Sequence, residues 1–225
     1  MRDYLRPVFL VAWKDVLLEL RSREVVVASL VFAVLVVVVF NFALNVTPET
    51  VDILAPGVLW VAFAFAGILA MSRAFVIEKD KGSLDGLLLC PVSRDSIYFG
   101  KMLALFAFMM VVEALLLPIF AVLFDFSAFS FTLVGIILLA TLGFATVGTL
   151  FSAIAVQTRS REIMLPILFF PLVTPVLIGA VEGSTGTITD NFSAIGVGRW
   201  LQLIGVFDAV FLVLCPWAFG LVTEE

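Results

Sequence analysis

Histidine is absent from this sequence of 225 residues, and cysteine occurs only twice. Histidine is the commonest metal ligand, haem axial ligand and general base among side chains, so its absence argues against an autonomous catalytic site. The two cysteines, Cys90 and Cys215, lie far apart and provide neither a disulfide framework nor a metal-ligand spacing. We therefore expect no catalytic residues, no metal site and no cofactor bound by this chain alone.

Charged residues are also scarce. They make up 14% of the chain, against 63% hydrophobic residues, and the mean hydropathy is +1.21. The charged fraction of a soluble domain is usually about 25%. This composition excludes a soluble globular domain and predicts a chain whose main solvent is lipid.

Six apolar stretches emerge when the sequence is read with a window of about 19 residues. As helices, all are long enough to cross a hydrocarbon core of about 30 Å at about 1.5 Å per residue. They cover residues 25–44, 53–72, 102–124, 131–156, 163–181 and 201–219. No repeat or low-complexity region divides the chain. The prediction is a single all-α, polytopic membrane domain over residues 1–225.

The basic residues predict how this domain is oriented. Twelve of the 13 lysine and arginine residues lie before the first stretch, between the second and third, or between the fourth and fifth. All three regions fall on the same side of a six-helix plan, and Arg199 alone falls on the other. Basic residues concentrate in cytoplasmic loops. Both ends of the chain are therefore predicted to be cytoplasmic.

Residues 1–24 precede the first stretch and are predicted to form an amphipathic helix in the cytoplasmic membrane interface. Apolar residues recur there at helical spacing, although Leu10, Val11 and Leu18 fall off the stripe. This helix is either a membrane anchor or a lever that touches a cytoplasmic partner. The stripe consists of Leu5, Val8, Phe9, Ala12, Trp13, Val16, Leu17 and Leu20.

Prolines mark irregular helices. Pro118 lies inside the third stretch, and Pro166, Pro171 and Pro175 crowd the fifth. Each removes a backbone hydrogen bond, so the fifth helix is predicted to be kinked or broken. Residues 182–199, with four glycines, are predicted to form the longest exterior loop, with room for a short re-entrant piece.

The most specific pattern lies in the predicted cytoplasmic segment 73–101. Gly82 permits a turn, Ser83 is a favourable helix N-cap, and Pro91 ends a short helix over residues 84–89. Such a helix is too short to span a bilayer. We interpret it as a short capped helix held between two transmembrane helices, an arrangement suited to transmitting force.

Leu84, Leu87 and Leu88 share one face of this short helix. That face must be buried against lipid headgroups, against its own bundle or against another protein, and the residues alone leave these three fates open. Ser93 is the predicted N-cap of the third transmembrane helix. Asp95 is favourably placed in the positively polarised first turn that follows.

The pattern of this segment is similar to the cytoplasmic coupling segment of type 2 ABC exporters. Flanking residues 54–63, 138–156 and 165–183 narrow the match, and nearly the whole chain resembles the cytochrome c maturation protein B family of bacterial haem exporters. The matching residues are Glu78, Asp80, Gly82, Ser83, Leu84, Asp85, Leu87, Leu88, Pro91, Val92, Gly100 and Lys101.

The resemblance implies a non-catalytic permease subunit in the bacterial inner membrane. Its implied partners are a cytoplasmic ABC ATPase that binds ATP and Mg²⁺, a membrane subunit that handles haem, and a periplasmic haem chaperone. In keeping with a separate ATPase, this sequence has no phosphate-binding loop of the G-x-x-x-x-G-K-[ST] type. No nucleic acid is expected among the partners.

Three residues inside the predicted spans are candidates for intramembrane function. An ionised carboxylate at mid-bilayer costs several kcal/mol unless it is paired or protonated, so Glu113 and Asp208 are expected to face protein or water. Each either bridges helices or takes part in a substrate path or a coupled movement, and the two could share one polar contact. Trp60 lies about 10 Å inside its helix, too deep for the interfacial aromatic belt, and serves either packing or a subunit or substrate contact.

The sequence therefore predicts a permease subunit for haem export or haem delivery in cytochrome c maturation. One alternative is a type 2 exporter permease for a glycan or a drug, and another is a passive membrane scaffold of the haem machinery. The sequence leaves open whether haem passes through this subunit or ATP drives release of a loaded chaperone. Subunit stoichiometry is likewise open.

Overall fold

A computed structural model describes residues 2–22, 24–44, 48–73, 75, 86, 92–124, 130–156, 161–188 and 196–222. Within these residues the chain is helical almost throughout and contains no strand. The helices are α1 (Arg2–Ser22), α2 (Glu24–Ala43), α3 (Pro48–Arg73), α6 (Arg94–Phe124), α7 (Phe131–Val156), α8 (Arg161–Ile188) and α10 (Val197–Val222). The all-α prediction is confirmed for this part of the chain.

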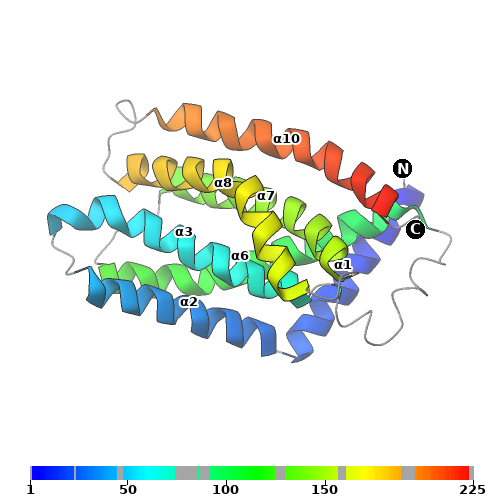
Figure 1. The fold of residues 1–225 in the computed structure, drawn as a ribbon, viewed down its shortest axis with the longest axis horizontal. Coiled ribbons are helices and arrows are strands. Elements are labelled where there is room, and N and C mark those ends of the chain that lie inside the picture. Colours follow the sequence, from blue (N-terminus) through cyan, green and yellow to red (C-terminus); the bar gives the residue numbers. More distant parts are fainter. Residues whose placement is uncertain are drawn as a thin grey trace.

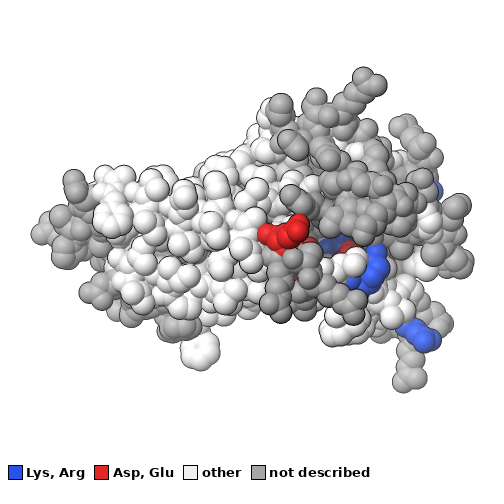
Figure 2. Space-filling view, turned by 90° about the horizontal axis from the view of Figure 1, so that it is seen from below, with Lys and Arg blue, Asp and Glu red and all other residues white. Residues whose placement is uncertain are grey.

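In the described part of the chain, the six helices after α1 are long and apolar enough to cross a membrane. They run along the length of the molecule as a bundle, and the start of α1 and the end of α10 lie at the same end of it (Figure 1). On the face shown in Figure 2, described charged side chains gather toward that end. The prediction of a six-helix, multi-pass membrane protein is confirmed.

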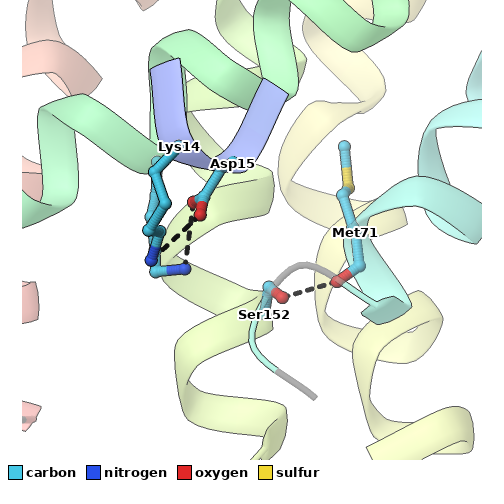
Figure 3. A network of polar contacts seen from close by, with 5 residues as sticks. Lys14, Asp15, Met71 and Ser152 are labelled. Carbon is cyan, nitrogen blue, oxygen red and sulfur yellow. Dashed lines mark hydrogen bonds and ion pairs between the residues drawn. The ribbon is translucent and has the colours of Figure 1, made fainter. Parts of the chain in front are cut away.

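Helix α7 lies at the centre of the bundle and is rich in Gly, Ala, Ser and Thr. Its membrane span is 72% buried, against 28% for α2 and for α10, and it packs against α3, α6, α8 and α10. Small residues allow close helix approach where no hydrophobic effect drives association. Ser152 Oγ donates a hydrogen bond to the backbone oxygen of Met71 at 2.5 Å, which joins α7 to the end of α3 (Figure 3).

Helix α8 carries Pro166, Pro171 and Pro175 and bends visibly along its length (Figure 1). The predicted start of the exterior loop at Glu182 is wrong, because α8 continues to Ile188. The continued part of α8 packs closely against α7, since a methyl group on Gly183 would lie 3.1 Å from Cδ1 of Ile136. The predicted end of the loop at Arg199 is also wrong, because α10 starts at Val197. Residues 189–195 lie outside the described residues.

Helix α6 starts at Arg94, directly after the predicted cap residue and about two turns before its apolar stretch begins at residue 102. Ser93 directly precedes the helix, and its backbone oxygen accepts a hydrogen bond from the amide of Ser96 at 3.0 Å. Asp95 lies in the first turn. The predicted cap residue and acidic first turn are therefore confirmed, although the helix extends further toward the charged end than its apolar stretch indicates.

Candidate functional site

The predicted ATPase-coupling residues lie outside the described residues, but both ends of their segment are described. Phe75 stands at the entry, and Val92 and Ser93 lead into α6 at the exit. The structure therefore describes the base of the site, where the segment joins the charged end of the bundle. The residues outside the description are Glu78, Asp80, Gly82, Ser83, Leu84, Asp85, Leu87, Leu88 and Pro91.

Aromatic packing fixes the entry of the segment. Phe75 is buried, and its ring centroid lies 6.2 Å from that of Phe219 near the end of α10. Tyr98 on α6 contacts Phe219 at 5.5 Å and donates a hydrogen bond to the backbone oxygen of Thr146 on α7 at 2.6 Å. Lys101 Nζ lies 4.4 Å from the Phe75 ring centroid, within the range of a cation–π contact.

The exit of the segment is tied to the same helix end. Arg94 Nη1 donates a hydrogen bond to the backbone oxygen of Gly220 at 3.0 Å. The last carbonyls of a helix lack intrahelical partners and carry partial negative charge, so an arginine there is favourable. The end of α10 therefore contacts both Phe75 and Arg94, which flank the undescribed residues of the segment.

An ion pair joins α1 to this base. Lys101 Nζ on α6 lies 3.2 Å from Asp15 Oδ2, and Lys14 Nζ lies 3.1 Å from Asp15 Oδ1 (Figure 3). The Lys101 side chain is 2% exposed and that of Lys14 is 43% exposed. We call Asp15, Phe75, Tyr98, Lys101 and Phe219 the basal cluster.

Gly100 lets α1 approach α6 closely. A methyl group at Gly100 would lie 2.7 Å from Cβ of Val11 and 2.9 Å from the backbone oxygen of Val8. The matched sequence pattern included Gly100 and Lys101 but did not predict that they contact α1. The available signal was the helical spacing of Val8, Val11, Ala12 and Asp15, at i, i+3, i+4 and i+7.

The structure divides the predicted apolar stripe of α1 between the bundle and the exposed surface. Val11, which that stripe excluded, is buried against α6, whereas Phe9 and Trp13, which it included, are exposed and stack on each other with centroids 6.3 Å apart. Because the helices approach closely at Gly100, only small side chains fit between them, and the large rings of Phe9 and Trp13 point outward. One side of α1 therefore packs on protein and another presents aromatic surface.

Glu113 lies inside the bundle and bridges two helices. It is 2% exposed, and Thr141 Oγ1 on α7 lies 2.8 Å from each of its carboxyl oxygens. Phe63 and Met109 are among the residues that line a small depression beside it, between α3 and α6. This contact satisfies the hydroxyl of Thr141 and gives the carboxyl group a protein partner, as a buried polar group requires.

Asp208 is 3% exposed, and neither of its carboxyl oxygens has a hydrogen-bond partner among the described residues. It lies against the bare face of Gly143 on α7, where a methyl group would be 2.6 Å from Oδ1. Thr141 and Gly143 are two residues apart and point about 200° apart around the helix. The suggestion that Glu113 and Asp208 share one polar contact is therefore wrong.

Trp60 is fully enclosed inside the bundle. Its Nε1 donates a hydrogen bond to Ser184 Oγ on α8 at 2.9 Å. Its ring lies edge-on to Phe63 at 5.5 Å and to Phe144 at 6.2 Å. These contacts within the chain account for a tryptophan at this depth. They favour a packing role for Trp60 over the predicted alternative of a subunit or substrate contact.

The comparisons with known proteins agree with one another. A family model described as CcmB protein matches residues 6–224. Heme exporter protein B of Rhodobacter capsulatus is 29% identical over 206 residues, which cover 91% of this chain and 93% of the relative. The same-named protein of Paracoccus denitrificans is 28% identical over 210 residues (91% and 93%), and that of Pseudomonas aeruginosa is 28% identical over 193 residues (84% and 83%).

Proposed function

The chain belongs to the CcmB protein family, and on that premise we propose that it is the permease subunit of an ATP-driven complex for haem export or delivery in cytochrome c maturation. The observation that carries the proposal is the family match, which extends over residues 6–224 and therefore includes the whole bundle and the segment between α3 and α6. Relatives of nearly the same length bear the name heme exporter protein B.

In this proposal the subunit transmits motion and catalyses nothing itself. ATP and Mg²⁺ are bound by a separate cytoplasmic ABC ATPase, which docks on the segment between Phe75 and Val92. Leu87 and Leu88 are the proposed apolar contacts of that docking site. The basal cluster supports this role, because α1 and α7 contact the start of α6, which follows the segment, and α10 contacts Phe75 at its entry.

The proposed orientation places both ends of the chain in the cytoplasm of a bacterium, with the bundle in the inner membrane. It rests on the lysine and arginine distribution and on the common location of the start of α1 and the end of α10 (Figure 1). In this orientation the exposed Phe9 and Trp13 of α1 lie at the level of the lipid headgroups, where aromatic rings are favourable.

We favour a mechanism in which this subunit drives release of a haem-loaded chaperone over one in which haem passes through this chain. The sequence has no histidine to ligate haem iron. The proposed complex therefore includes a second membrane subunit that handles haem and a periplasmic chaperone that receives it. ATP-driven motion of this subunit then releases the loaded chaperone from its neighbour.

The test of the proposed function is the double variant Leu87→Asp with Leu88→Asp. Burial of a leucine side chain contributes about 1.5–3 kcal/mol, and a buried charge adds a desolvation cost, so the variant should lose its ATPase. Membrane insertion should survive, since the six apolar spans are unchanged. The volume-conserving control Leu87→Met with Leu88→Met should keep the ATPase.

The measurements are ATPase pull-down in mild detergent and cytochrome c production in the same cells. Wild-type chain that captures no ABC ATPase would refute the motor role and leave a passive scaffold. Full association and full maturation in the double Asp variant would show that the segment is an interfacial anchor. Normal cytochrome c in cells that lack this chain would favour export of another substrate, such as a glycan or a drug.

A further inference from the structure

Helix α1 offers apolar side chains on most of its circumference. Val8, Val11 and Ala12 are buried against the bundle, whereas Phe9 and Trp13 are 67% and 54% exposed. Burial of apolar surface is favourable but non-directional. Apart from the close fit of Val11 against Gly100, apolar packing therefore distinguishes poorly between this position of α1 on α6 and one that is rotated or shifted along the helix.

A second contact that distinguishes them, and the polar one, is the pair between Asp15 and Lys101. The two charged atoms lie 3.2 Å apart, with the lysine side chain 2% exposed and the aspartate side chain 18% exposed. A buried ion pair contributes little net stability compared with apolar side chains of similar volume, whereas loss of one partner leaves an uncompensated charge. Its best-attested use is to fix the register of packed helices.

Lys101 connects this pair to the coupling segment. Its ammonium group lies 4.4 Å from the ring centroid of Phe75, which stands at the entry of that segment. The ring of Phe75 is itself held by Phe219 at 6.2 Å. A shift of α1 that displaces Asp15 therefore also displaces Lys101, whose ammonium group contacts Phe75.

We propose that Asp15 and Lys101 are positioning residues that lock the register of α1 on α6 and hold α1 and the entry of the coupling segment as one unit. The mechanical consequence rests on the proposed function, because it requires that an ATPase docks on that segment. When the ATPase moves the segment, α1 moves with it, and its exposed aromatic surface moves relative to the membrane.

The first experiment measures the position of α1 without any partner. In a chain whose native cysteines are removed by Cys90→Ser and Cys215→Ala, Ala12→Cys places a thiol in the contact between α1 and α6, where Ala12 is buried. The rate of its modification by a membrane-permeant maleimide is measured in native membranes. In the otherwise unchanged chain this thiol should react slowly.

Asp15→Asn and Lys101→Met should each raise the maleimide rate by about tenfold or more, because each leaves a buried group without its charged partner. The matched control Lys14→Gln removes the exposed partner of Asp15 and should stay within about twofold of the parent. The exchanged pair, Asp15→Lys with Lys101→Asp, should restore protection.

Parental rates in both Asp15→Asn and Lys101→Met would overturn the proposal. If Lys101→Met fails to accumulate in the membrane, the comparison of Asp15→Asn with the exchanged pair decides. Protection lost in the first and regained in the second supports the register lock. Equal protection in the two refutes it.

The second experiment measures cytochrome c formed per ATP hydrolysed in the complex with the ATPase. Asp15→Asn should keep ATPase association and hydrolysis but lower this ratio by about tenfold, since the motion no longer reaches α1. An unchanged ratio in a variant whose maleimide rate has risen would refute the link to output. Wild-type chain that captures no ATPase would refute the proposed function instead, and the maleimide rates would still decide the register lock.

Discussion

Trp60 on α3 donates a hydrogen bond through Nε1 to Ser184 Oγ on α8, at 2.9 Å and away from solvent. The two residues are 124 positions apart in sequence. Ser184 lies in the part of α8 that continues past the predicted end of the fifth span, after all three prolines of the helix. The bond is therefore one of the contacts that hold the bent helix in place.

Trp60→Phe keeps an aromatic ring and removes the donor. We expect a loss of about 1 kcal/mol in the free energy of unfolding, and about the same for Ser184→Ala, with little further loss in the double variant. Thermal stability in detergent, followed by size-exclusion chromatography, measures this. Normal stability of Trp60→Phe with loss of a partner subunit would instead assign Trp60 to a subunit contact.

The contact between Glu113 and Thr141 predicts different outcomes for two variants. Thr141→Val removes the donor and should lower the free energy of unfolding by about 0.6–1.7 kcal/mol. Glu113→Gln keeps an acceptor for Thr141 and avoids any cost of a buried charge, so its stability should equal or exceed that of the wild type. Unfolding in detergent is measured alongside cytochrome c production. A stable Glu113→Gln variant without cytochrome c would assign the carboxyl group to function.

Gly143 makes room for Asp208, which gives a prediction with a control on the same helix. Gly143→Ala would place a methyl group 2.6 Å from Asp208 Oδ1, so it should destabilise the fold by about 1–3 kcal/mol. Gly135 on α7 has nothing within 4 Å of the added methyl, so Gly135→Ala should be neutral or stabilising by up to about 1 kcal/mol. Asp208→Ala combined with Gly143→Ala should recover stability relative to Gly143→Ala.

Thermal unfolding of these variants in detergent provides the comparison. If Gly143→Ala is as stable as Gly135→Ala, the carboxyl group of Asp208 does not occupy the space beside α7. Recovery in the double variant with loss of cytochrome c production would assign Asp208 to function.

The proposed orientation predicts the behaviour of reporter fusions. Fusions after Thr47, Phe126 and Asn191 should be active for an exterior reporter, and those after Ser160 and Glu225 for a cytoplasmic one. The activity of alkaline phosphatase and of green fluorescent protein at each site measures this. An exterior signal at Ser160 would contradict the six-span topology.

Isolated chain should bind haem weakly and without a defined axial ligand, because it has no histidine. Titration of purified protein with haem, followed by absorption spectroscopy, measures this. A stoichiometric spectrum that is abolished by a single Met or Cys substitution would contradict the chaperone-release mechanism and place haem in this chain.

The sequence by itself determined the class of the protein and the approximate position of its helices. The apolar stretches are long enough, and poor enough in charge, that the bilayer requires them to be helical. Ser93 and Asp95 at the start of α6 were readable too, because capping depends on neighbours along the chain. The end of α8 was misplaced, since this helix continues beyond its apolar stretch.

Only the tertiary structure decided which faces of the helices meet. In lipid, helices are apolar on all sides, so hydrophobic periodicity does not indicate the protein-facing side. That side is selected by local fit between distant residues, such as the bare surface of Gly100 beside Val11, the space beside Gly143 that Asp208 occupies, and the hydroxyl of Thr141 within reach of Glu113. Such pairings depend on how the helices cross in three dimensions, and no spacing along the chain encodes them.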